Sequence, residues 1–175
     1  MPKLRAQSLL CLAVPVMTAG AAHAGGIELT VEIPKLSVAE YHRPYVAIWI
    51  EDKDKKVAAN LSVWYATKLK DDEGEKWLKD IRQWWRRGGN KLDMPADGIS
   101  SPTKPPGVNK VTFPSDKGPL ASLAPGDYKL IVEATREVGG KEMVEVPVKW
   151  APGAEATASA KGKDELGAVT LKLTK

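Results

Sequence analysis

Residues 45–50 read Tyr-Val-Ala-Ile-Trp-Ile, a nearly continuous apolar run with the length of a β-strand. A strand that is apolar at successive positions is typical of sheets covered on both faces, so we expect a central strand here. The charged residues 51–54 then form a turn, and residues 57–64 return as the hairpin partner. We expect the fold to be built around this hairpin.

Further strands surround this hairpin along the chain. Apolar and polar residues alternate, or short apolar runs stand between turn formers, at residues 27–33, 110–113, 127–135, 141–150 and 168–173. Residues 138–140, Val-Gly-Gly, turn the chain between two of these strands, whereas residues 151–163 are rich in Ala, Gly and Lys and are not expected to form a strand. About seven short strands separated by turns predict a mainly β fold, an immunoglobulin-like β-sandwich.

One segment, residues 73–87, has the period of a helix instead. Its large apolar residues fall on one face at about 3.6 residues per turn. They are Trp77, Leu78, Ile81, Trp84 and Trp85. Asp71 and Asp72 are suited to cap the start, and Gly88-Gly89 to end it. We expect one inserted amphipathic helix, with Trp77 and Ile81 buried against the sandwich.

The N-terminus has the order of a secretory signal. The basic residues Lys3 and Arg5 precede an apolar run at 9–17, and Ala22-His23-Ala24 supplies a cleavage site. The run is shorter than the roughly 20 residues that span a bilayer. We therefore expect residues 1–24 to be a cleaved signal peptide, and residues 25–175 to be a single periplasmic domain without a membrane anchor.

The composition of residues 25–175 limits the kinds of functional site that the domain can carry. Removing residues 1–24 takes away Cys11, Lys3 and Arg5 and no acidic residue, so the net charge falls from +4 to +2. A nearly neutral chain gives no electrostatic basis for binding nucleic acid. His42 is the one histidine left, which argues against His/Cys metal centres and against nucleophile–His catalysis. The residue inventory is thus poor for a hydrolase, and we expect the protein not to be a stand-alone enzyme.

The loop at residues 97–107 reads Asp-Gly-Ile-Ser-Ser-Pro-Thr-Lys-Pro-Pro-Gly. These residues are turn formers, and a polar loop between a helix and a strand needs no cofactor. The order Asp97, Ser100, Thr103 nevertheless resembles the acceptor sequence of FAD:protein FMN transferase substrates, which carry FMN on the hydroxyl of the last Thr. The resemblance implies a covalent phosphoester between FMN and Thr103, with Asp97 and Ser100 in the recognised segment.

The loop departs from the usual acceptor sequence at one point. Gly-Ala commonly stands before the modified Thr, and here Ser101-Pro102 takes its place. Proline lacks an N–H and pushes the preceding residue toward an extended conformation. A transferase that requires a tight glycine turn would be impaired, whereas an extended acceptor segment would tolerate the proline.

The whole chain also resembles the family of predicted periplasmic proteins numbered as domain of unknown function twenty-two seventy-one. The shared features are the strand at 46–52, the Trp-rich helix, the Asp-to-Pro-Pro-Gly loop, and the strand at 126–134 followed by Arg136-Glu137. Members of that family often accompany flavin transferases and membrane proteins of the PepSY type. The resemblance implies a setting of periplasmic electron transfer.

Two hypotheses for the function remain open. In the first, the chain is an electron carrier whose FMN on Thr103 is reduced by a PepSY-type membrane partner, with Trp85 as an aromatic surface for the ring. In the second, the chain is a cofactor-free binding or assembly module. The intact mass of the periplasmic protein distinguishes the two.

Overall fold

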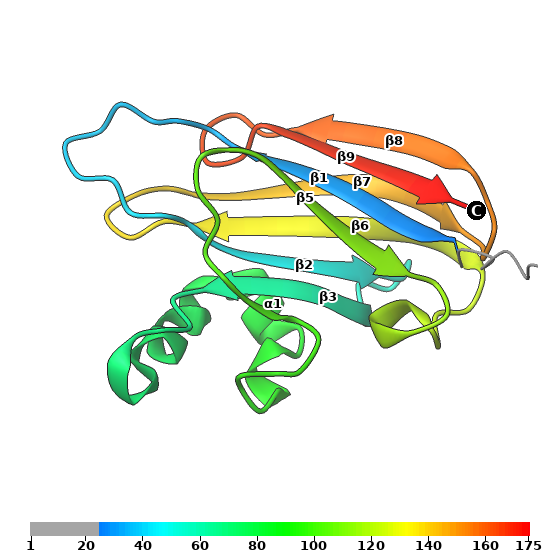
Figure 1. Cartoon of the computed structure of the whole chain (residues 1–175), viewed down its shortest axis with the longest axis horizontal. Helices are drawn as coiled ribbons and strands as arrows, with labels where there is room; N and C mark the ends of the chain where they lie inside the picture. Colours follow the sequence, from blue (N-terminus) through cyan, green and yellow to red (C-terminus); the bar gives the residue numbers. More distant parts are fainter. Residues whose placement is uncertain (1–24) are drawn as a thin grey trace, which may run out of the picture.

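The computed structural model describes residues 25–175, so the signal peptide expected at residues 1–24 lies outside the described residues. Two β-sheets face each other (Figure 1). The four-stranded sheet has the order β5-β1-β9-β8, with β1 at Gly26–Ile33, β5 at Gly107–Pro114, β8 at Ala156–Lys161 and β9 at Ala168–Thr174. The five-stranded sheet has the order β4-β3-β2-β6-β7, with β4 at Ser100–Pro102, β3 at Val57–Tyr65, β2 at Tyr45–Glu51, β6 at Gly126–Thr135 and β7 at Lys141–Trp150.

The strand order confirms a mainly β sandwich. The last strand, β9, pairs antiparallel with the first, β1, over a register that runs from Gly26 opposite Thr174 to Val31 opposite Val169. In immunoglobulin constant domains the first and last strands belong to different sheets. The order seen here therefore does not establish the immunoglobulin-like type, although the two-sheet sandwich itself is as expected.

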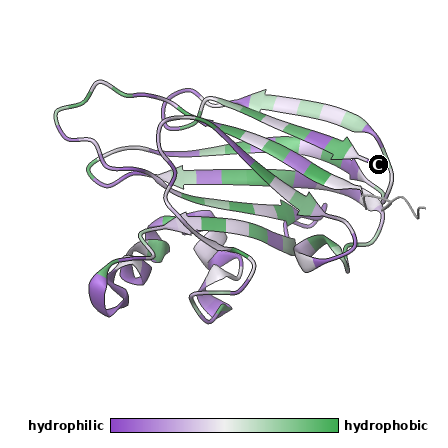
Figure 2. Cartoon of the chain, viewed as in Figure 1, coloured by the Kyte–Doolittle hydropathy of each residue, from purple (hydrophilic) through white to green (hydrophobic). Residues whose placement is uncertain are grey.

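Strand β2 is covered on both faces, as its apolar run predicts. Val46, Ile48 and Ile50 belong to the inner core, the buried apolar side chains that β1, β2, β3, β5, β6, β7 and β9 direct between the sheets. Ala47 and Trp49 point the other way. Figure 2 shows the hydrophobic bands that result along the central strands. Each face of β2 thus contributes to a separate apolar cluster.

The outer cluster lies on the opposite face of the five-stranded sheet. Its buried members are Ala47, Trp49, Val63, Tyr65, Leu78, Ile81, Trp84 and Ile131. They come from the sheet and from the insert, the segment of η1 (Lys70–Asp80), α1 (Arg82–Arg86) and η2 (Gly89–Lys91) that covers this face. A further short 3-10 segment, η3 (Gly118–Leu120), follows β5.

The insert is not the single amphipathic helix that the spacing predicts. The segment η1 is 3-10 helix with a kink at its second and third residues, whose backbone angles are not helical, and the five residues of α1 follow only after a break at Ile81 (φ −78°, ψ 77°). A 3-10 helix has about three residues per turn. The buried residues Leu78, Ile81 and Trp84 follow this spacing of three, which places Trp77 outside the cluster with 50% of its surface exposed. Ile81 is buried as expected, and the expected burial of Trp77 is wrong.

The start of the insert also differs from the prediction. Asp71 and Asp72 have φ values of 53°, in the left-handed region, and no side chain caps η1. The end agrees better, because α1 stops just before the two glycines. Gly89 is required there, since a Cβ at this position would lie 2.6 Å from ring atoms of Trp84.

Two buried carboxylates hold the insert against the sheet. Glu133 of β6 accepts hydrogen bonds from the backbone N–H of Gln83 at 3.0 Å and of Trp84 at 2.9 Å. Glu51 of β2 accepts from Trp49 Nε1 at 2.7 Å and forms an ion pair with Arg87. Both carboxylates lie on the outer face, and 2% of Glu51 and 5% of Glu133 are exposed.

Two strands were not expected from the sequence. β8 forms in the stretch rich in Ala, Gly and Lys and pairs with β9. β4 forms within the predicted loop and pairs parallel with β3, from Val63 opposite Ser100 to Tyr65 opposite Pro102. No helix within residues 25–175 is long and apolar enough to cross a membrane.

Candidate functional site

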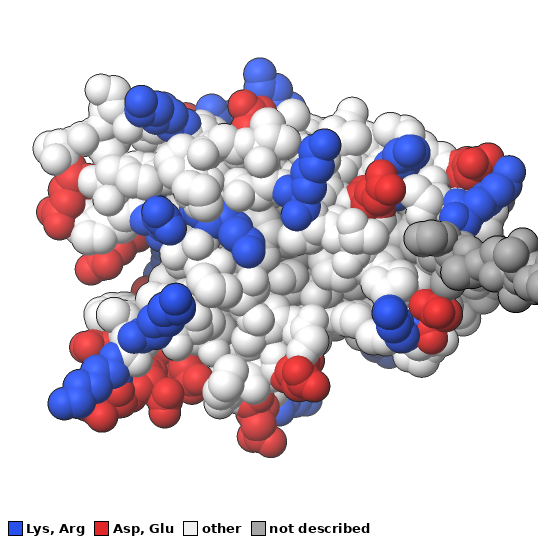
Figure 3. Space-filling model, viewed as in Figure 1, with Lys and Arg blue, Asp and Glu red and all other residues white. Residues whose placement is uncertain are grey.

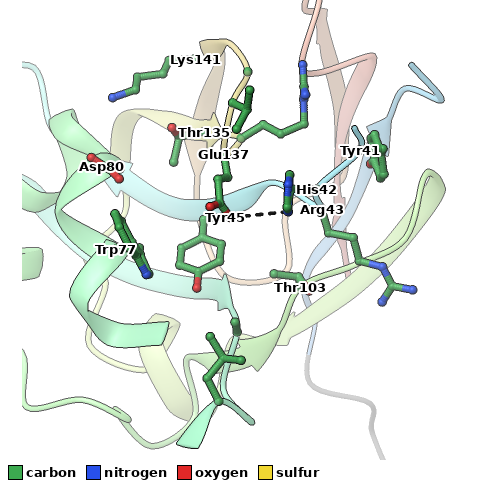
Figure 4. A pocket seen from close by; sticks show the side chains of 15 residues that line it. Tyr41, His42, Arg43, Tyr45, Trp77, Asp80, Thr103, Thr135, Glu137 and Lys141 are labelled. Atoms are coloured by element: carbon green, nitrogen blue, oxygen red, sulfur yellow. Dashed lines mark ion pairs between the residues drawn. The ribbon is translucent and has the colours of Figure 1, made fainter. Parts of the chain in front are cut away.

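An open pocket of about 810 Å³ lies at one end of the five-stranded sheet. Four parts of the chain meet around it: the loop ahead of β2, the insert, the segment after β4, and the turn between β6 and β7 (Figure 4). In Figure 3 the surface is hollowed at the left of the view, with acidic side chains gathered below the hollow. The residues that line the pocket are Tyr41, His42, Arg43, Tyr45, Ala66, Leu69, Trp77, Asp80, Thr103, Thr135, Arg136, Glu137, Val138, Gly139 and Lys141.

Thr103 reaches this pocket because β4 ends just before it. The Thr103 backbone N–H donates to the Tyr65 carbonyl at 3.1 Å, so the segment follows the edge of the sheet beyond β4. Pro102 is exposed on this edge strand, a position where a residue without an N–H is tolerated. The acceptor-like segment is therefore extended, and its Thr side chain lies at the pocket wall.

The other predicted site residues lie outside the pocket. Asp97 is exposed in the turn ahead of β4, and the hydroxyl of Ser100 is buried. Trp85 packs against the outer cluster, with its ring centroid 6.3 Å from that of Trp84. Of the predicted set, Thr103 alone lines the pocket, and Trp77 takes the place that was expected for Trp85.

Aromatic and aliphatic side chains form much of the pocket wall. Tyr45 projects between Trp77 and Thr103 in the view of Figure 4, and its ring makes an edge contact with Tyr65 at 6.3 Å. Leu69 is 47% exposed and Val138 is 79% exposed. An apolar wall with a few placed polar groups is typical of small-molecule sites.

The charges around the pocket mouth are of both signs. Nδ1 of His42 lies 3.5 Å from Glu137 Oε2 (the dashed line in Figure 4), and its Nε2 lies 2.9 Å from Glu40 Oε1. Arg43 and Lys141 are exposed cations that also line the pocket. The pocket thus offers cations without being uniformly basic, and the segment around His42 forms part of the site.

Arg136 forms a buried ion pair at the pocket wall. Its Nε and Nη2 donate to the two carboxylate oxygens of Glu165 at 2.9 and 3.0 Å. The hydrogen bond with Glu165 holds the pKa of Arg136 above its usual value. Arg136 is 8% exposed and Glu165 is 4% exposed, so the guanidinium is fixed in one orientation.

The loop that carries Glu165 is itself fixed by a second carboxylate. Glu142 of β7 accepts hydrogen bonds from four successive backbone N–H groups, those of residues 163–166, at 2.5 to 3.1 Å. Burial raises the pKa of Glu142, but these four donors lower it by more, so it lies below the usual value. Glu142 thus positions the loop that carries Glu165, and Glu165 in turn positions Arg136.

Most of this site could not be found from the sequence pattern. Tyr41, Trp77 and Arg136 are far apart in the chain, and no spacing rule connects them. The one available signal was Arg136 directly after a buried strand. Within residues 25–175, no group of three His, Cys, Asp or Glu side chains is placed to hold a metal ion.

Comparison with known proteins gives one match. The family described as predicted periplasmic protein (DUF2271) matches residues 26–168. No curated protein and no solved structure matches the chain significantly. The chain belongs to this family, and the family description agrees with the periplasmic location that the N-terminal sequence predicts.

Proposed function

We propose, with membership of this periplasmic family as the premise, that the protein is an electron carrier with FMN esterified through its phosphate to Thr103. The proposal rests on one observation above the others. Thr103, the last residue of the acceptor-like order, lies on the wall of an open pocket of about 810 Å³. When bound, the isoalloxazine ring supplies the electron transfer, and the chain attaches, orients and tunes it.

The residues of the pocket fit such a group in three respects. A hydroxyl stands at the wall in an extended, partly exposed segment. Trp77 offers a half-exposed ring on which a planar ligand can stack. Tyr41 Oη and Arg136 Nη1 are buried polar atoms without hydrogen-bond partners among residues 25–175, as expected where a ligand supplies the missing partner.

The attachment would be a phosphoryl transfer catalysed by an FAD:protein FMN transferase. Thr103 Oγ1 forms a bond to the phosphorus of the FMN half of FAD, and the pyrophosphate P–O bond breaks. AMP leaves, and the hydroxyl proton passes to a base of the transferase. The acceptor must enter another enzyme's active site, which the exposed Pro102 and Pro105 on either side favour.

A tethered cofactor explains why the pocket can remain open. A covalent bond gives the ring a high local concentration, so deep enclosure is not needed for affinity. An open pocket also leaves the ring accessible to electron donors and acceptors. We propose a PepSY-type membrane protein as the donor, because the resembling family members accompany such proteins.

Modification of the purified chain tests the proposal. Residues 25–175 are incubated with a flavin transferase, FAD and a divalent metal, and the intact mass is measured. We expect a gain of one FMN that survives denaturation. Thr103→Val removes the acceptor oxygen and is expected to abolish the gain, while Thr135→Val, the same change at another pocket threonine, is expected to leave it intact.

Two further variants examine recognition of the segment. Asp97→Ala is expected to slow attachment while leaving the acceptor oxygen in place. Replacing Ser101-Pro102 by Gly-Ala restores the usual acceptor sequence and is expected to speed attachment. If neither the wild type nor the Gly-Ala variant gains flavin, the carrier function is wrong and a cofactor-free binding module remains. Flavin on Thr103→Val would place the attachment elsewhere.

A further inference from the structure

Two buried polar atoms at the pocket wall lack partners within the described residues. They are Nη1 of Arg136 and Oη of Tyr41, and both residues line the pocket. A buried donor left without a partner carries a free-energy cost, because it has lost its hydrogen bonds to water. Native proteins accept such a cost where a ligand or an ordered water completes the hydrogen bond. Finding two of these atoms on one pocket wall indicates a polar recognition point.

The guanidinium is held so that Nη1 is the donor left over. Glu165 takes up Nε and Nη2, and its Oε1 also accepts from the Gly140 backbone N–H at 2.8 Å. Gly139 packs directly on the guanidinium, since a Cβ there would lie 2.3 Å from Arg136 Cζ. Arg136 therefore keeps its orientation before any ligand arrives, which reduces the entropy lost on binding.

Tyr41 belongs to the same environment. Burial raises the pKa of its hydroxyl, and the positive charge of Arg136 opposes that rise. The hydroxyl is thus protonated near neutral pH and serves as a neutral donor beside a charged one. A ligand atom that accepts from both would be an oxygen or nitrogen that carries negative charge.

Apolar surface in the same pocket selects the shape of the ligand. Trp77, Leu69 and Val138 expose apolar surface there. A planar conjugated ring with acceptor atoms along one edge meets both requirements. The pyrimidinedione edge of isoalloxazine has this form, with two carbonyl oxygens and a ring nitrogen, and gains negative charge when the ring is reduced.

We infer that Tyr41 and Arg136 bind the pyrimidinedione edge of the flavin and favour its reduced form, which raises its midpoint potential. This inference rests on the proposed function for the identity of the ring. The donors act as positioning and tuning residues, because charge near this edge changes the electronics of the ring. The chain would thus set the potential through side chains far in sequence from the attachment point.

The first experiment measures the midpoint potential of the covalently loaded chain. Tyr41→Phe removes one donor that has no protein partner, so folding should be unaffected, and the potential is expected to fall. Arg136→Lys keeps a cation to pair with Glu165 but removes Nη1, and a larger fall is expected. Tyr128→Phe is the matched control, because its hydroxyl bonds to the Ala124 carbonyl outside the pocket.

The second experiment needs no covalent flavin. The Thr103→Val chain is titrated with free riboflavin, and binding is followed by fluorescence. Adding Tyr41→Phe is expected to weaken binding roughly threefold to tenfold, the value of one hydrogen bond. Adding Tyr128→Phe is expected to leave binding unchanged.

The outcomes separate the two proposals. If Tyr41→Phe and Arg136→Lys change neither the potential nor the riboflavin affinity, the inference is overturned, while loading at Thr103 stands. If the wild type never gains FMN, the carrier function is wrong. The riboflavin titration alone then tests whether the donors at the pocket wall bind a flavin ring. The inference is supported if the variants change the midpoint potential or the riboflavin affinity and Tyr128→Phe does not.

Discussion

The two faces of the five-stranded sheet are stabilised in different ways. The inner core is a large cluster of apolar side chains from both sheets, and Trp64 within it donates a hydrogen bond to the buried hydroxyl of Ser62. The outer cluster is smaller and richer in aromatic rings, and Glu51 and Glu133 hold the insert at its margin. Burial is non-directional, whereas a buried carboxylate requires its donors at fixed positions. Packing on the inner face therefore stabilises the sandwich, whereas the carboxylates on the outer face fix the position of the insert.

This difference matters because the insert shapes the pocket. Trp77 and Asp80 reach the pocket wall from η1, which is attached through the outer cluster. A change on the inner face should destabilise the whole chain. A change on the outer face should release the insert first and alter the pocket before the sandwich unfolds.

The largest effect is expected on the inner face of β2. Ile48 is fully buried in the inner core, and Ile48→Ala should lower the free energy of unfolding by about 2–5 kcal/mol. Denaturant unfolding measures the loss, and hydrogen exchange should show weaker protection in both sheets. Loss of protection confined to β2 and its neighbours would contradict a shared core.

A smaller effect, with a different distribution, is expected from Glu133. Glu133→Ala leaves the part-buried N–H of Gln83 and the buried N–H of Trp84 without an acceptor, which should cost about 2–3 kcal/mol. Hydrogen exchange should show the loss first in residues 82–87. Glu133→Gln keeps an acceptor oxygen and should recover part of the stability. Equal loss of protection in both sheets would remove the distinction between the two faces.

The loop behind Arg136 should respond to pH. Because the folded-state pKa of Glu142 is lowered from 4.5, its stabilisation is present above the unfolded pKa and is lost as pH falls through the folded value. Glu142→Gln should therefore cost about 1 kcal/mol at neutral pH and progressively less below about pH 4.5. Thermal unfolding from pH 7 to pH 3 measures this, and a cost independent of pH would contradict the assignment.

The smallest effect on stability is expected from Trp77. Since half of its surface is exposed, Trp77→Ala should change the unfolding free energy by less than about 0.5 kcal/mol. Trp84→Ala, the buried control, should cost about 3–5 kcal/mol. Trp77→Ala should still weaken riboflavin binding to the Thr103→Val chain. A large loss of stability would show that Trp77 belongs to the outer cluster.

The fold was predictable where one segment carries its own pattern. β2 and the β6–β7 hairpin follow from apolar runs and turn formers within a few residues. β8 was missed because its Ala, Ser and Lys side chains are largely exposed, and β4 because three residues become a strand only through pairing with β3. The predicted single helix is wrong because the prediction assumed an α-helical spacing of apolar residues. The buried residues of the insert instead recur with the 3-10 spacing.

The site was predictable only in part for a related reason. Thr103 was identified by a local motif, but its pocket is assembled from segments that no local pattern connects. Trp77 and Trp85 could not be told apart from their spacing, since the break at Ile81 decides which ring faces the pocket. A local motif located the attachment point, and only the fold locates its surroundings.

The pairing of β1 with β9 has a consequence for how the chain acquires its structure. Contacts such as Gly26 with Thr174 join residues 148 positions apart, and contacts this distant in sequence slow folding. The four-stranded sheet cannot be completed until the last strand is available. The pairing of β1 with β9 therefore makes completion of the four-stranded sheet a late step of folding, because it brings together strands from opposite ends of the described residues.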